Sequence, residues 1–127
     1  MNLAFRILPG TFAVCRFAAD ADPPSSITRG DLLSITRTRE ELSLVCPESA
    51  APSGAKCEGN WACLKLEGPF PFALTGILSS FLLPLAQHNI PIFAVSTFDT
   101  DYVLVKRETL EAALAALEAA GHRLLPS

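Results

Sequence analysis

The sequence contains little of what enzyme active sites are usually built from. Its 127 residues include only two histidines, His88 and His122. Each follows a helical pattern directly, which is typical of a helix-end residue rather than of a general base. The glycines are too widely spaced for a phosphate-binding loop, as at Gly54, Gly59 and Gly68. Because catalysis also requires a nucleophile with its base or carboxylates with shifted pKa values, we expect a protein that is not an enzyme.

Metal-binding patterns are missing as well. The four cysteines, Cys15, Cys46, Cys57 and Cys63, do not form the paired spacings of zinc sites, and two histidines cannot complete such a set. We therefore expect no metal and no cofactor. In a cytoplasmic chain, free thiols are the usual state of cysteine. A Cys46–Cys57 disulfide across the intervening loop is the alternative.

Basic charge and long apolar runs are also scarce. The net charge is −3 and the pI is about 5.3, which argues against nucleic-acid binding. The local group of Arg29, Arg37 and Arg39 fits a solvated strand edge. No apolar run reaches the roughly 18–20 residues of a membrane span, because prolines and polar residues interrupt the richest region at residues 84–91. Without a signal-peptide pattern, a cytoplasmic protein that does not bind membranes is expected.

What the sequence does contain is a large apolar fraction. Half of the residues (50%) are hydrophobic and the mean hydropathy is +0.34. A chain of this length can bury a substantial core. The remaining apolar surface predicts a covered interface, for which a homodimer is the expected arrangement.

The second half alternates between two hydrophobic periods. Residues 61–67 alternate as a half-buried strand does. From Leu74 the apolar residues recur at helical spacing, with Thr75 as the candidate N-cap. Pro84 predicts a kink or an early end, and we expect no helix beyond about Gln87.

Two further strands and a helix follow. Residues 91–96 and 101–106 are apolar, β-rich runs joined by a polar turn, and they predict a hairpin of central strands. Residues 108–120 form an alanine-rich helical pattern that ends before Gly121. Residues 123–125 can add a short strand. The resulting βαββαβ order predicts an α+β, ferredoxin-like sandwich.

The first half contains strand patterns without a long helix. Residues 3–8 and 12–17 alternate around Pro9-Gly10 and predict a hairpin. A second strand pair is predicted at residues 32–38 and 41–46, followed by a linker at residues 47–60. We therefore divide the chain into two domains, 1–58 and 59–127, of which the first is a strand-only, degenerate relative of the second.

Several of these segments resemble the ACT domain. The resemblance rests on residues 70–78, on Pro84-Leu85-Ala86 and on residues 90–105, and residues 34–46 are similar to the N-terminal unit of the tandem-ACT group. That group includes the regulatory domains of aspartate kinases and a cytosolic arginine sensor. The resemblance implies a tandem fold, with residues 1–58 as a degenerate ACT-like unit and residues 59–127 as the ACT domain.

The resemblance also implies that an amino acid binds at the seam between two ACT units. The residues suit this role, because Thr75-Gly76-Ile77 opens a helix whose free amides can receive a carboxylate. Asp99 and Asp101 can receive an ammonium or a cationic side chain. Hydroxyl groups that can complete the site are those of Ser96, Thr97 and Thr100, with Thr36 and Thr38 as the equivalents in the first half.

Each of these residues also has a purely structural interpretation. Thr75 can be an N-cap, Gly76 a close-packing residue, and the two aspartates turn formers that bond their own backbone. The leading hypothesis is a non-catalytic, amino-acid-binding regulatory protein that controls a partner enzyme. The alternative is an assembly module that docks a partner enzyme without a ligand.

Overall fold

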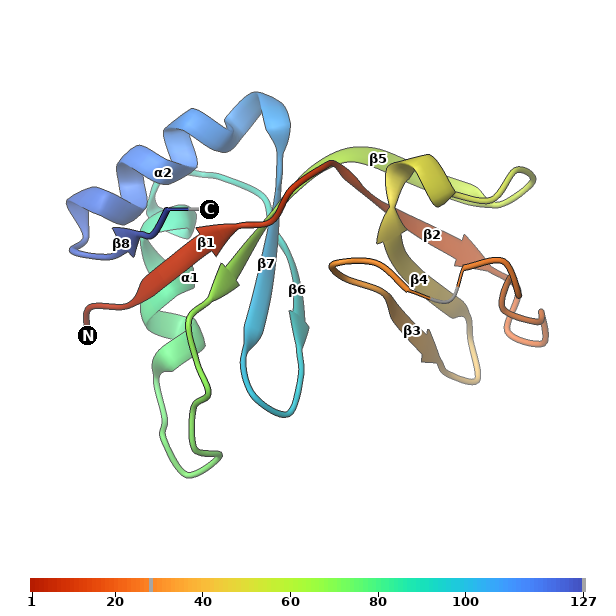
Figure 1. The fold of residues 1–127 in the computed structure, drawn as a ribbon, viewed down its shortest axis with the longest axis horizontal. Coiled ribbons are helices and arrows are strands. Elements are labelled where there is room, and N and C mark those ends of the chain that lie inside the picture. Colours follow the sequence, from red (N-terminus) through yellow and green to blue (C-terminus); the bar gives the residue numbers. More distant parts are fainter. Residues whose placement is uncertain (28, 127) are drawn as a thin grey trace. The chain divides into compact units, whose positions relative to one another are not determined.

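The computed structural model describes residues 1–27 and 29–126. The chain forms two compact units: the C-terminal unit combines Met1–Leu8 with the residues from Ala62 onward, and the N-terminal unit comprises Pro9–Trp61. Strand β5 (Lys56–Leu66) passes from one unit into the other (Figure 1). Met1–Leu8 therefore belongs with the second half of the chain, and the division into domains at residues 58 and 59 stays a prediction.

The C-terminal unit has the predicted βαββαβ order, with one strand added. Its strands follow the spatial order β8-β1-β5-β7-β6. In the chain, α1 lies between β5 and β6, and α2 lies between β7 and β8. The bounds of its remaining elements are β1 Ala4–Ile7, α1 Ile77–Gln87, β6 Phe93–Ser96, β7 Asp101–Lys106, the 3₁₀ turn Arg107–Thr109, α2 Leu110–Ala119 and β8 Arg123–Leu124. Without β1, the order is that of a ferredoxin-like sheet.

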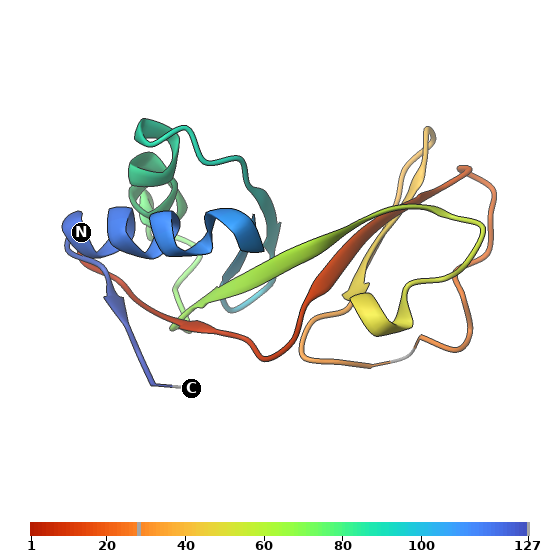
Figure 2. The same cartoon turned by 90° about the horizontal axis from the view of Figure 1, so that it is seen from above.

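Both helices pack on one face of this sheet (Figure 2). Phe81 of α1 and Leu117 of α2 share a fully buried core with Leu64 of β5 and Val103 of β7. Alternate residues of β5 and β7 point into this core, as a pleated sheet requires. Only β7 is a central strand of the hairpin, because β6 pairs with β7 alone among the described residues. The prediction of two central strands was therefore wrong for β6.

The predicted hairpin of residues 3–8 and 12–17 does not form. Instead, β1 pairs antiparallel with β5, with Phe5 opposite Leu66, and parallel with β8, with Ala4 opposite Arg123. The alternation of β1 serves to place Phe5 in the core, where its ring meets the Phe81 ring edge-on at 5.2 Å. The pattern indicates a strand correctly, but it does not identify its partner.

The β5 strand is longer and more buried than its sequence predicts. It begins at Lys56, so the last residues of the predicted linker are in fact strand. Trp61 is 7% exposed and Cys63 is fully buried although both lie opposite the helix-facing residues. The half-buried prediction was therefore wrong for this part of β5.

Helix α1 begins two residues after the predicted N-cap. Its N-cap is Gly76, whose φ of 81° falls in the left-handed region that glycine adopts without strain, and no side chain caps the helix. Thr75 is thus not the N-cap. Pro84 lies within the helix, which continues to Gln87, the end that the sequence predicts.

The N-terminal unit consists of strands, without an α-helix among its described residues. Its strand order is β3-β4-β2-β5, from β2 (Phe12–Phe17), β3 (Ser34–Arg37) and β4 (Leu42–Pro47), and a 3₁₀ turn covers Glu48–Ala50. The pairing of β3 with β4 is the predicted second strand pair.

A disulfide joins Cys15 of β2 to Cys57 of β5. The two residues lie directly opposite each other across the β2–β5 ladder. Cys46 instead lies opposite Ala13, and both Cys46 and Cys63 are buried free thiols. The predictions of four free thiols and of a Cys46–Cys57 bridge were therefore wrong, because sequence spacing does not reveal strand register.

Candidate functional site

The β5–α1 loop and the β6–β7 turn (residues 97–100) meet at one end of the C-terminal unit. The Phe70 amide donates a hydrogen bond to the Asp99 carbonyl oxygen at 2.8 Å. The Thr100 hydroxyl, which is buried, donates to the Leu66 carbonyl oxygen at 2.8 Å. These two bonds hold the loop and the turn against each other, so that the two groups of predicted site residues become neighbours.

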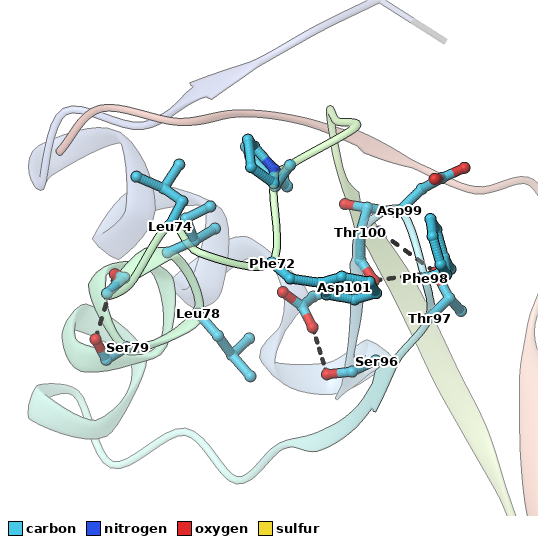
Figure 3. Close-up of a pocket in the computed structure, with 14 residues that line it drawn as sticks. Phe72, Leu74, Leu78, Ser79, Ser96, Thr97, Phe98, Asp99, Thr100 and Asp101 are labelled. Atoms are coloured by element: carbon cyan, nitrogen blue, oxygen red, sulfur yellow. Dashed lines mark hydrogen bonds between the residues drawn. The ribbon is translucent and has the colours of Figure 1, made fainter.

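A cavity of about 450 Å³, which we name the α1 pocket, lies between the start of α1 and this turn (Figure 3). Thr75 does not line it and is exposed. The predicted residues that do line it are Gly76, Ile77, Ser96, Thr97, Asp99, Thr100 and Asp101. The structure thus brings seven predicted residues of the second half together around one cavity.

The hydroxyl groups of the turn are already engaged in backbone bonds. The Thr97 hydroxyl donates to the Thr100 carbonyl oxygen at 3.1 Å and accepts from the Thr100 amide at 3.4 Å. Thr100 is committed to Leu66, as described above. The structural interpretation therefore accounts for both threonine hydroxyls, which shape the pocket wall.

The two aspartates differ in orientation. The Ser96 hydroxyl donates a hydrogen bond to the Asp101 carboxylate, and this pair lies at the end of the β6–β7 ladder. In Figure 3 the Asp99 carboxylate points away from Asp101 and carries no hydrogen bond to the residues drawn. Asp101 is thus the carboxylate that is oriented next to the aromatic side chains of the pocket.

An aromatic pair at the pocket had not been predicted. The rings of Phe72 and Phe98 meet edge-on with centroids 4.7 Å apart, although Phe72 is 73% and Phe98 77% exposed. One ring comes from each of the two loops, as Figure 3 shows. A phenylalanine inside a polar turn, such as Phe98, is the sequence signal that could have indicated it.

The pocket has an uneven charge distribution. Its lining residues include Asp99 and Asp101 and no lysine, arginine or histidine, and of the two aspartates only Asp101 has its carboxylate next to the aromatic side chains. At its other side α1 begins without a side-chain cap, so its first-turn amides, such as those of Leu78 and Ser79, remain available as donors. The pocket therefore offers the Asp101 carboxylate for a cationic group and helix amides for an anionic group.

Comparison with known proteins identifies the family. A family model described as ACT domain matches residues 56–119. The chain belongs to the ACT domain family. A second family model, described as an N-terminal domain, matches residues 10–54, so the N-terminal unit accompanies the ACT domain as a recognisable unit of its own.

Curated relatives of this ACT protein include a human protein named CASTOR3P, which is 32% identical over 98 residues, or 67% of this chain. The cytosolic arginine sensor for mTORC1 subunit 1 of Bos taurus is 29% identical over 101 residues, or 71% of this chain. The match spans 60% of the first relative's length and 31% of the second's.

Solved structures confirm the ferredoxin-like ACT fold. A protein from Agrobacterium tumefaciens is 40% identical with a TM-score of 0.92, and the match covers 98% of this chain and 93% of that one. The regulatory subunit of aspartate kinase from Thermus flavus has a TM-score of 0.65 at 12% identity, covering 94% and 99%. At this identity the second match shows a shared fold.

The predicted residues of the first half lie outside the pocket of the ACT domain. Thr36 is an exposed residue of β3, and the Thr38 hydroxyl accepts hydrogen bonds from the Glu40 and Glu41 amides at 3.1 and 3.2 Å. Thr38 thus stabilises the β3–β4 turn. Both threonines belong to the N-terminal unit, whereas every residue that lines the α1 pocket belongs to the C-terminal unit.

The histidines of this ACT protein are hydrogen-bonded and its free cysteines are buried. His88 caps the end of α1 and His122 is buried, with both ring nitrogens hydrogen-bonded. Burial raises the pKa of the Cys63 thiol to about 12 and also raises that of Cys46. In the described part of the chain no three His, Cys, Asp or Glu side chains gather as metal ligands, and no helix there has the length and apolarity to cross a membrane.

Proposed function

We propose that this protein is a non-catalytic, allosteric regulator that binds a free amino acid in the α1 pocket and reports its presence to a partner enzyme. The pocket supports this proposal, because Asp101 and the uncapped start of α1 lie at the same cavity. A zwitterion carries the two complementary charges. Its α-carboxylate would accept hydrogen bonds from the α1 amides, and its α-ammonium would face Asp101.

The lining charges also favour one class of ligand side chain. An oriented carboxylate, that of Asp101, without a basic lining residue repels aspartate and glutamate and favours a cationic side chain. The face of an aromatic ring attracts cations as well, and Phe72 and Phe98 stand at the pocket. A relative is named a cytosolic arginine sensor, so arginine is our first candidate ligand, and its name supports a cytoplasmic location.

A thermal-shift screen against the twenty amino acids tests the proposal. Specific binding must raise the melting temperature as the ligand concentration exceeds the dissociation constant. We expect a rise with arginine or lysine and none with aspartate or glutamate. The absence of a shift with every amino acid at millimolar concentration would contradict the proposed function.

The variant Asp101→Asn locates the binding site. It removes the charge opposite the α-ammonium, and we expect the dissociation constant to rise roughly tenfold or more. Asp20→Asn is the matched control, because Asp20 is an exposed aspartate of the N-terminal unit. Equal affinity in both variants would place the ligand elsewhere.

A second candidate function is assembly without a ligand. Phe72, Leu74, Leu83 and Phe98 expose large apolar surfaces, and β6 has an unpaired edge among the described residues. Such features support a homodimer or the docking of a partner enzyme. Sedimentation over a range of concentrations tests this candidate, which predicts self-association whether or not an amino acid is present.

A further inference from the structure

A second cavity, of about 240 Å³, lies beside the β6–β7 turn in the same unit. We name it the β5 pocket. Lys65 of β5 and Tyr102 of β7 line it, together with Glu67, Gly68 and Asp99. Because their neighbours Leu64, Leu66 and Val103 point into the helix-covered core, Lys65 and Tyr102 lie on the opposite face of the sheet. The turn is thus a wall that the two cavities share.

The charged groups of the β5 pocket are only partly paired. Glu67 binds Arg6, whose Nε donates to its carboxylate at 3.1 Å. The half-buried side chains of Lys65 and Tyr102 make no hydrogen bond or ion pair with the described residues. The Asp99 carboxylate points away from Asp101 (Figure 3). The cavity therefore offers an ammonium, a phenol and a carboxylate that remain available to a ligand.

The backbone around this cavity is fixed before any ligand arrives. The bonds from Phe70 to Asp99 and from Thr100 to Leu66 hold the turn against the β5–α1 loop. A Cβ atom at Gly68 would lie 2.9 Å from the Asp99 carbonyl oxygen, so only glycine allows this approach. A preformed site costs a ligand less conformational entropy than one that must order on binding.

We propose that the β5 pocket is a second site, which binds a small zwitterion. The ligand's carboxylate would face the Lys65 ammonium and the Tyr102 hydroxyl, and its ammonium would face Asp99. The cavity is smaller than the roughly 300–1,000 Å³ of drug-sized ligand sites, which favours a ligand with a short side chain. This site has a cation and the α1 pocket has none, so the two select different ligands, and the second proposal does not rest on the first.

Glycine is the minimal zwitterion and serves as the probe. In a titration of the full chain followed by amide NMR, we expect saturable shifts at Lys65 and Tyr102. Lys65→Gln should raise the dissociation constant for glycine roughly tenfold to a hundredfold, since it removes a charge-assisted hydrogen bond. Lys56→Gln is the matched control on the same strand and should leave it unchanged, because Lys56 does not line the β5 pocket.

Acetate and methylamine provide a test that requires no variant. Each carries one of the two charges, and we expect each to bind at least about tenfold more weakly than glycine. The proposal is overturned if the shifts at Lys65 and Tyr102 do not saturate, if Lys65→Gln retains the affinity of the wild type, or if acetate alone equals glycine. The last outcome would identify a simple anion site.

Discussion

At the scale of single residues, His122 supplies a hydrogen-bond donor that Pro84 cannot provide. Proline has no N–H, so the Ser80 carbonyl oxygen loses its helical donor four residues on. The His122 Nε2 lies 3.0 Å from this oxygen, and its Nδ1 lies 3.1 Å from the Leu3 amide nitrogen. Because an amide can only donate, Nδ1 is the acceptor and the proton resides on Nε2. The ring thereby connects α1 to the segment before β1.

We expect His122→Ala to lower the free energy of unfolding by about 2–4 kcal/mol, from two lost hydrogen bonds and a buried cavity. In a Pro84→Ala background the cost should be about 1 kcal/mol smaller, because the substituted residue supplies the missing N–H. A double-mutant cycle by urea denaturation measures this coupling. Strictly additive costs would show that the histidine does not compensate for the proline.

The Cys63 thiol gives the protein a stability that depends on pH. Its pKa is raised from 9.0 to about 12 by burial, so the unfolded chain loses this proton at lower pH than the folded chain. The contribution of this thiol to the free energy of unfolding is therefore fully present below pH 9. It falls as the pH rises toward 12, by up to about 1.4 kcal/mol per pH unit. Denaturation between pH 8 and 10.5 should show a shallower decline in Cys63→Ala, and equal slopes would contradict this account.

At the scale of elements, the Cys15–Cys57 disulfide strengthens the small N-terminal unit, which is built mainly from strands. It closes a separation of 42 residues, for which the chain-entropy model gives about 4 kcal/mol of stabilisation. Among the described residues, the buried cluster around Cys15 has just four other buried members, which are Ala13, Ile27, Leu44 and Cys46.

Reduction should therefore lower the unfolding free energy of the N-terminal unit by up to about 4 kcal/mol. Urea denaturation with and without dithiothreitol measures the effect. Cys57→Ala should match the reduced wild type and respond no further to reductant, since Cys57 is exposed and its truncation leaves no core cavity. A Cys57→Ala variant that still responds to reductant would contradict this assignment.

Elements also show how far the sequence predicts this fold. Hydrophobic periods identify β7, α2 and the end of α1, because these patterns depend on residues close in the chain. The partner of β1 and the Cys15–Cys57 pair depend on strand register between distant segments, which a local pattern does not contain. The site follows the same division: the β6–β7 turn is predictable, whereas the meeting of Phe72 with Phe98 requires the tertiary fold.

At the scale of the whole molecule, the exposed aromatic pair separates the two candidate functions. If Phe98 forms part of an amino-acid site, Phe98→Ala should weaken binding about two- to tenfold and leave the sedimentation coefficient unchanged. If the pair forms an interface, the same variant should dissociate an oligomer without altering any ligand affinity. Leu83→Ala is the control for the ligand-binding measurement alone, because Leu83 is also exposed but does not line the α1 pocket.

The insertion of β1 into the C-terminal sheet has a consequence for biosynthesis. Phe5 pairs with Leu124, 119 positions later in the chain. At a ribosomal speed of about 5–20 residues per second, this partner is synthesised roughly 6–24 s after the first strand. During that interval the edge of β1 that pairs with β8 has no native partner, and this pairing must wait until residues 123 and 124 have been synthesised. The sheet that carries both pockets is therefore complete only when β1 and β8, its first and last strands in the chain, pair with each other.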